Sequence, residues 1–172
     1  QFGAVAGLFA AVPDVDVVYA PVGLLLRSTA TVGPDVFWET ANVIHRGPTH
    51  SLVMGGALAL AVFCWQADHP AGRLIAVPLA LALVAAGGLG SGAVGGVVVL
   101  VFVVSGFAVG YLADRGGLAP RPLLAAGLLG LLSHPFGDLF TGSPPPLLYP
   151  FDLVVVAERV ALSPDPTGQL FA

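Results

Sequence analysis

The segment 93–112, AVGGVVVLVFVVSGFAVGYL, contains no Asp, Glu, Lys or Arg, and it decides the class of fold. A helix needs about 20 consecutive, mostly apolar residues to cross the hydrocarbon layer of a bilayer, and this segment meets that length by itself. It also contains Gly95, Gly96, Gly106 and Gly110. Small residues at such spacings allow membrane helices to approach one another closely. The segment therefore predicts a transmembrane helix packed within a bundle.

The composition of the whole chain extends this prediction. Hydrophobic residues make up 56% of the 172 residues, charged residues only 9%, and the mean hydropathy is +0.92. A soluble domain carries about 25% charged residues, so this chain has too few to cover a surface that faces water. The net charge of −4 gives no basis for binding nucleic acid. We expect a mostly α-helical, multi-pass protein of the cell or inner membrane, with residues 1–172 forming one domain in contact with the lipid bilayer.

Shorter apolar runs lie on both sides of the first segment. Together they predict about four to six hydrophobic helices, of which the last is interrupted by proline and charge and is expected at the membrane interface. These runs are residues 2–12, 52–65, 74–88, 123–132 and 147–162.

A more polar segment, residues 13–50, is predicted to form a loop after the first run. If each of the four runs between residues 52 and 132 crosses the membrane once, the chain makes an even number of crossings. The segment that ends at His50 and the segment that begins at Ser133 then emerge on the same face, and Asp14 joins them there. The count predicts a polar His/Asp cluster at one membrane face, where ionisable residues are costly and usually functional.

His134 and Asp138 are spaced i, i+4, which on a helix places both side chains on one face. An imidazole and a carboxylate in this arrangement can bind a divalent cation. The same spacing also fits a His–Asp hydrogen bond that merely satisfies a half-buried pair, and both readings stay open. Because the residue before a proline disfavours the α region, we expect a helix to begin near His134, with Pro135 in its first turn.

His45 and His50 are separated by a Gly-Pro pair, which predicts a turn leading into the next helix. Thr49 or Ser51 is expected to cap that helix. The two histidines are either metal ligands or interfacial polar residues, and the presence of His134 and Asp138 in the same chain favours ligands. Arg46 offers a fork of donors to a phosphate or carboxylate, although a snorkelling interfacial arginine is equally consistent.

Asp14 and Asp16 follow an apolar helix and a proline. One of them is a candidate metal ligand or a base that takes a proton from metal-bound water. Acidic residues are also common in turns at helix exits, so this reading stays open beside the other. His69 falls on the opposite face in the crossing count and is expected in a loop.

Three motifs in order along the chain resemble a known family: PDVD at 13–16, HRGPTHS at 45–51 and SHPFGD at 133–138. The segments LFT at 139–141 and PLLYPF at 146–151 strengthen the likeness. Together they resemble the membrane-bound, metal-dependent hydrolases of the YdjM type, which are LexA-regulated in some bacteria. The resemblance implies a distant relation to zinc-dependent phospholipase C and to zinc-dependent single-strand nucleases.

By this resemblance the divalent metal is zinc, and members carry a further histidine in the first helix. No histidine precedes Asp14 here, and the chain begins at Gln1, so we expect the natural N-terminus to lie upstream. The implied metal ligands are Asp14, His45, His50, His134 and Asp138.

The expected function is hydrolysis of an ester or phosphoester by a metal-activated water, with Asp14 or Asp16 as base and Arg46 as a phosphate contact. A small-molecule or lipid phosphoester fits a site at headgroup depth. The alternatives are a non-enzymatic membrane protein whose cluster holds a structural metal or conducts ions or protons, and a scaffold with an incidental cluster.

Overall fold

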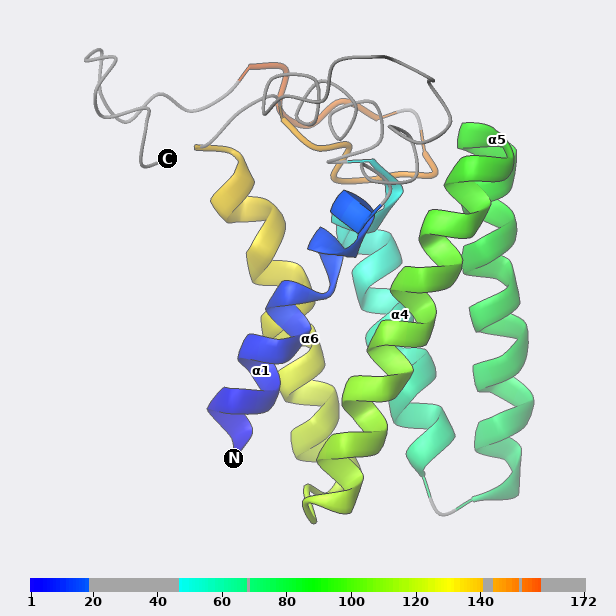
Figure 1. Ribbon diagram of the computed structural model, residues 1–172, viewed down its shortest axis with the longest axis vertical. Coiled ribbons are helices and arrows are strands. Elements are labelled where there is room, and N and C mark those ends of the chain that lie inside the picture. Colours follow the sequence, from blue (N-terminus) through cyan, green and yellow to red (C-terminus); the bar gives the residue numbers. More distant parts are fainter. Residues whose placement is uncertain (19–46, 68, 141–143, 152, 159–172) are drawn as a thin grey trace, which may run out of the picture.

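The computed structural model describes residues 1–18, 47–67, 69–140, 144–151 and 153–158, and these residues form helices and turns without a strand (Figure 1). The predicted mostly α-helical class is therefore confirmed for the described part of the chain. The helices are α1 (Phe2–Ala11), η1 (Pro13–Val18), η2 (Pro48–His50), α4 (Leu52–Gln66), α5 (Pro70–Arg115) and α6 (Pro120–Asp138).

Helix α5 reverses direction near its middle. Ser91 and Gly92 leave the helical region, and Gly92 has a φ of 69°, a left-handed conformation that glycine adopts without strain. A Cβ atom built on Gly88 would lie 3.9 Å from the Cα atom of Gly96. Residues eight apart in a continuous helix are separated by about 12 Å, so α5 consists of two antiparallel arms, residues 70–90 and 93–115 (Figure 1).

Small residues allow the helices to pack closely, as the glycines of segment 93–112 predict. A Cβ on Gly106 would meet the side chain of Leu58, which is fully buried on α4. On the other side of the bundle, a Cβ on Gly130 of α6 would meet the backbone of α1 at Ala6 and Ala10. Glycine therefore allows α4 to pack closely on the second arm of α5, and α1 to pack on α6.

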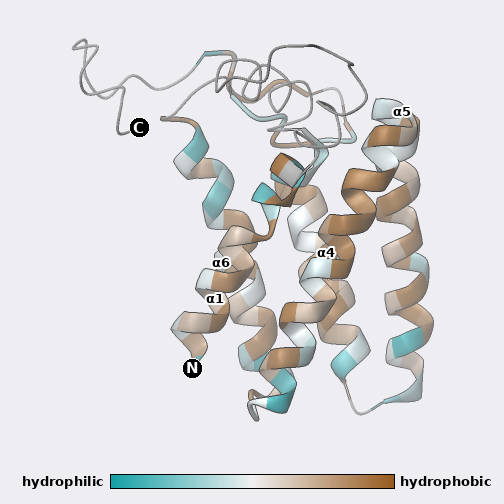
Figure 2. Cartoon of the chain, viewed as in Figure 1, coloured by the Kyte–Doolittle hydropathy of each residue, from teal (hydrophilic) through white to brown (hydrophobic). Residues whose placement is uncertain are grey.

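Apolar residues predominate along much of α5 (Figure 2), and many of them are exposed. Leu74, Leu89 and Val104 are 76%, 90% and 58% exposed, and they belong to a larger set of exposed aliphatic side chains on α5. Among the described helices, α5 alone is long and apolar enough to cross a membrane, and α4 is a shorter apolar helix. Exposed apolar surface of this kind marks contact with lipid or with another protein.

Successive helices alternate in direction, so both ends of the polar segment 13–50 and the end of α6 lie at one end of the bundle (Figure 1). The expected helix start near His134 is wrong, because α6 runs without a break from Pro120 to Asp138 with Pro135 inside it. The proline lies in the last turn, where it removes only one hydrogen bond from a helix already formed upstream. The run 147–162 contains no helix within its described residues, 147–151 and 153–158.

Candidate metal centre

Three elements bring ionisable side chains to the same end of the bundle. Asp14 and Asp16 lie on η1, His50 ends η2, and His134 and Asp138 lie in the last turns of α6. These elements are far apart in sequence but in contact in the fold. The cluster predicted from the crossing count is therefore present in the described part of the chain.

Local hydrogen bonds fix His50 at the start of α4. The Oγ of Ser51 accepts from the backbone N–H groups of Val53 and Met54, so the predicted serine cap is confirmed. The same hydroxyl lies 2.7 Å from the carbonyl oxygen of Tyr149, and the backbone N–H of Leu52 donates to the carbonyl oxygen of Leu147. The segment around Tyr149 thus holds the η2–α4 junction in place, and His50 is fully buried beside it.

Asp14, His50 and His134 form a compact triad of possible ligand atoms. The two Nε2 atoms are 3.2 Å apart, and the Oδ1 atom of Asp14 lies 3.3 Å from Nε2 of His134 and 3.6 Å from Nε2 of His50. Ligand atoms about 2.0–2.1 Å from a tetrahedral zinc ion lie about 3.3 Å from one another. The triad therefore has the dimensions of one face of a tetrahedral zinc site.

Asp138 approaches the same two imidazoles. Its Oδ2 atom lies 3.3 Å from Nε2 of His50 and 3.4 Å from Nε2 of His134. The i, i+4 spacing on α6 therefore directs His134 and Asp138 to one place, as the sequence predicts. Asp138 is mostly buried, whereas the side chain of Asp14 is 50% exposed.

Asp16 contacts His50 from the other side of the imidazole ring. Its Oδ2 atom lies 3.3 Å from Nδ1 of His50 and accepts a hydrogen bond of 2.8 Å from the hydroxyl of Thr49. Asp16, Thr49 and His50 are all fully buried. A carboxylate that accepts the Nδ1 proton leaves the Nε2 lone pair free to bind a metal, and this arrangement is common around zinc.

The electrostatics of the cluster favour a protonated imidazole when no metal is bound. Burial lowers the pKa of His50, but hydrogen bonds with Asp14 and Asp16 and the charges of Asp16 and Asp138 outweigh it and raise the pKa from 6.5 to about 9. Burial also raises the pKa of Asp14, yet hydrogen bonds and positive charge from His134 and His50 hold it well below its usual range. A divalent cation would replace the proton between these same groups.

The remaining residues singled out from the sequence fall elsewhere. His45 and Arg46 lie outside the described residues. His69 lies at the opposite end of the bundle, where its Nδ1 caps α5 by accepting from the N–H of Ala71. The sequence did not identify Thr49 as a partner of Asp16; its place next to His50 in the motif at 45–51 was the available signal.

These features define a class: a bundle of apolar helices that carries a buried His/Asp cluster at one end, with ligand spacing suited to a metal ion. The chain matches the family model described as YdjM inner membrane protein over residues 1–168, and it belongs to that family. The resemblance based on the three motifs is thereby confirmed, and with it the assignment to a family of inner membrane proteins. No curated protein and no solved structure matches the chain.

Proposed function

We propose that the protein is a multi-pass, metal-dependent hydrolase of the inner membrane that holds zinc at the Asp14, His50 and His134 triad. The observation that carries the proposal is the spacing of the three ligand atoms, 3.2–3.6 Å, which fits one face of a zinc tetrahedron. Asp138, which contacts both imidazoles, is the candidate for a further ligand or for a bond that orients them.

The multi-pass topology is supported by the two arms of α5. Each arm exceeds the about 20 residues that a helix needs to cross a bilayer, and both carry exposed aliphatic side chains. Helix α4 packs beside the two arms, and α6 packs on α4 and α1. Both alternate in direction with the arms, so we propose that they cross as well (Figure 1). The metal centre then lies at the headgroup depth of one leaflet.

The donor set favours zinc over magnesium or calcium. Two imidazole nitrogens beside one or two carboxylates suit zinc, whereas magnesium and calcium prefer oxygen ligands alone. The contact of Asp16 with Nδ1 of His50 adds the outer carboxylate that zinc-bound histidines usually have. A role for Asp16 as the base stays a prediction, but its complete burial and its position favour orientation of His50.

Zinc, when bound, lowers the pKa of a water molecule to about 7 and so supplies hydroxide at neutral pH. The protein's own residues would place this chemistry beside the membrane surface, because Asp14, one of the three proposed ligands, has a side chain that is 50% exposed. Arg46, four residues before His50, is proposed as the contact for a phosphate group. A lipid-like phosphoester fits this position, in keeping with the proposed relation to zinc-dependent phospholipase C.

A non-enzymatic role is the alternative. The cluster could hold a structural metal or conduct ions or protons, as ionisable residues within membranes often do. Transporters place such residues midway along their spans, frequently at broken helices. Here the cluster lies at helix ends beside a long polar segment, and this position favours hydrolysis.

The proposal is tested by assaying zinc-loaded protein in bilayer discs against a chromogenic phosphodiester and against phospholipids. His134→Ala should lose at least about a hundredfold in rate, because it removes one of three ligands. His69→Ala, which changes a histidine at the opposite end, should keep the wild-type rate. Equal activity of both variants, or hydrolysis of none of these substrates by zinc-loaded wild type, would contradict the proposal and favour a non-enzymatic role.

A further inference from the structure

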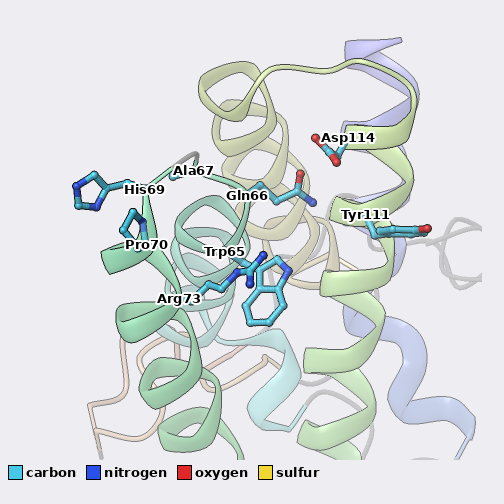
Figure 3. Close-up of a pocket in the computed structure, with 8 residues that line it drawn as sticks. All are labelled: Trp65, Gln66, Ala67, His69, Pro70, Arg73, Tyr111 and Asp114. Atoms are coloured by element: carbon cyan, nitrogen blue, oxygen red, sulfur yellow. The ribbon is translucent and has the colours of Figure 1, made fainter.

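A polar pocket lies at the end of the bundle opposite the metal centre (Figure 3). At this end α4 ends, the first arm of α5 begins and the second arm of α5 ends. It has a volume of about 520 Å³. His69 borders it but points away from the other side chains in Figure 3. The groups used below are Trp65, Gln66, Arg73 and Asp114.

The pocket contains one positive and one negative side chain that do not neutralise each other. The guanidinium of Arg73 lies 5.2 Å from the centre of the Trp65 ring and is held there by a cation–π contact. Within the described part of the chain, neither Arg73 nor Asp114 forms an ion pair. Gln66 adds a buried side-chain oxygen, Oε1, which has no hydrogen-bond partner among the described residues. The pocket therefore offers a cation, an anion and an unused acceptor.

An apolar groove begins where the polar pocket ends. It has a volume of about 300 Å³, its exposed lining is entirely apolar, and Trp65 borders both spaces. From Arg73 to Leu81 the first arm of α5 rises by about 12 Å toward the middle of the bundle. The groove lies between the two arms and is lined by Trp65, Val77, Ala80, Leu81, Val103, Val104 and Phe107.

From these two adjoining spaces we infer that this end of the bundle binds one phospholipid with an ethanolamine-type headgroup. The phosphate would lie on Arg73, the primary ammonium on Asp114 and on Oε1 of Gln66, and one acyl chain in the apolar groove. The inference depends on the placement of the helices in a bilayer, which the family assignment supports. It does not depend on the metal centre or on hydrolysis.

The charges of the pocket select this headgroup over the other common ones. A primary ammonium has three N–H donors, enough for both the Asp114 carboxylate and the Gln66 oxygen. A choline headgroup has no N–H group and would leave the buried oxygen of Gln66 without a partner. A glycerol headgroup has no positive charge, so it could offer Asp114 only neutral hydrogen bonds, which are weaker than those from an ammonium.

The test uses tryptophan quenching in full-length protein reconstituted into discs of phosphatidylcholine. Trp38→Phe leaves Trp65 as the only tryptophan in the chain. Phosphatidylethanolamine with brominated acyl chains is then added at increasing mole fraction, and brominated phosphatidylglycerol is added in a parallel series. We expect half-maximal quenching at a mole fraction about tenfold lower for phosphatidylethanolamine, because each charge-assisted hydrogen bond contributes about a factor of ten or more.

Variants separate the pocket from general lipid contact. Arg73→Gln and Asp114→Asn should each raise the half-maximal mole fraction about tenfold. Arg121→Gln removes the same charge from the same end of the bundle, outside the pocket lining, and should have no effect. Equal quenching by the two brominated lipids, or an equal shift in Arg121→Gln and Arg73→Gln, would overturn the inference. Release of the lipid by soluble phosphoethanolamine at a similar concentration would also overturn it, because the groove would then contribute nothing.

Discussion

Replacing Asp16 by asparagine removes a charge that faces the Nδ1 atom of His50 while it keeps the size of the side chain. The asparagine oxygen can still accept from Nδ1–H and from Thr49, whose hydroxyl lies 2.8 Å from the present carboxylate. The change therefore tests the charge behind the imidazole and leaves the packing of a fully buried residue in place.

The expected loss follows from the difference between two kinds of hydrogen bond. A hydrogen bond to a charged group contributes about 1.5–3 kcal/mol and a neutral one about 1 kcal/mol. Losing the charge should therefore cost about 0.5–2 kcal/mol, which corresponds to roughly two- to thirtyfold weaker zinc binding at a pH high enough for His50 to carry no proton. The pKa of His50 should also fall from about 9, because the charge of Asp16 is one of the causes that raise it. Below that pH the lower pKa reduces competition from the proton and offsets part of the loss, so the loss should be largest at high pH.

The assay is a competition titration of purified, metal-free protein with zinc and a chromophoric chelator, repeated at several pH values. Asp114→Asn is the matched control, since it makes the same change at the opposite end of the bundle and should bind zinc as the wild type does. If Asp16→Asn binds zinc within twofold of the wild type at every pH, Asp16 does not orient His50 as proposed.

Three further predictions test the electrostatics, the packing and the capping. In metal-free protein, protonated His50 contributes stability that is complete below pH 6.5 and is lost as the pH rises through about 9. The melting temperature should therefore fall between these pH values, and zinc affinity should rise, because the proton no longer competes with the metal. A zinc affinity that does not change with pH would contradict the pKa shift. Gly130→Ala should cost about 1–3 kcal/mol in a melt followed by circular dichroism, because its new methyl group meets the backbone of α1, whereas Gly7→Ala, which has open space around it, should be neutral or slightly stabilising. Ser51→Ala should cost about 1–2 kcal/mol, because it removes the helix cap and the bond to the carbonyl of Tyr149; an unchanged melt would show that neither bond matters.

The features that the sequence predicted depend on the periodicity of a helix and on the number of times the chain crosses the bundle. The spacing of His134 and Asp138 depends only on the pitch of a helix, and the meeting of both with His50 depends only on an even number of crossings between them. Ser51 as a cap follows from the preference of helix starts for serine. Each of these features is local, or follows from topology alone, and a pattern in the sequence is therefore enough to predict it.

Other features depend on contacts that no local pattern contains. The side of the His50 ring that Asp16 reaches is set by how η1 packs on η2, and the partner of Thr49 is 33 residues away. The prediction of a helix start near His134 considered only the local effect of Pro135, which disfavours the α region for the residue before it. The preceding turns of α6 already hold that segment in a helix, so one missing hydrogen bond near the end does not break it.

Metal content measures the central claim most directly. Wild-type protein, His50→Ala, His134→Ala and the control His69→Ala are purified without chelators, and zinc per chain is measured by elemental mass spectrometry. The triad geometry predicts about one zinc per chain in the wild type and in His69→Ala, and less than about a tenth of that in His50→Ala and His134→Ala. Equal zinc in all four proteins, or none in the wild type after zinc is supplied, would contradict the assignment of this cluster as a metal centre.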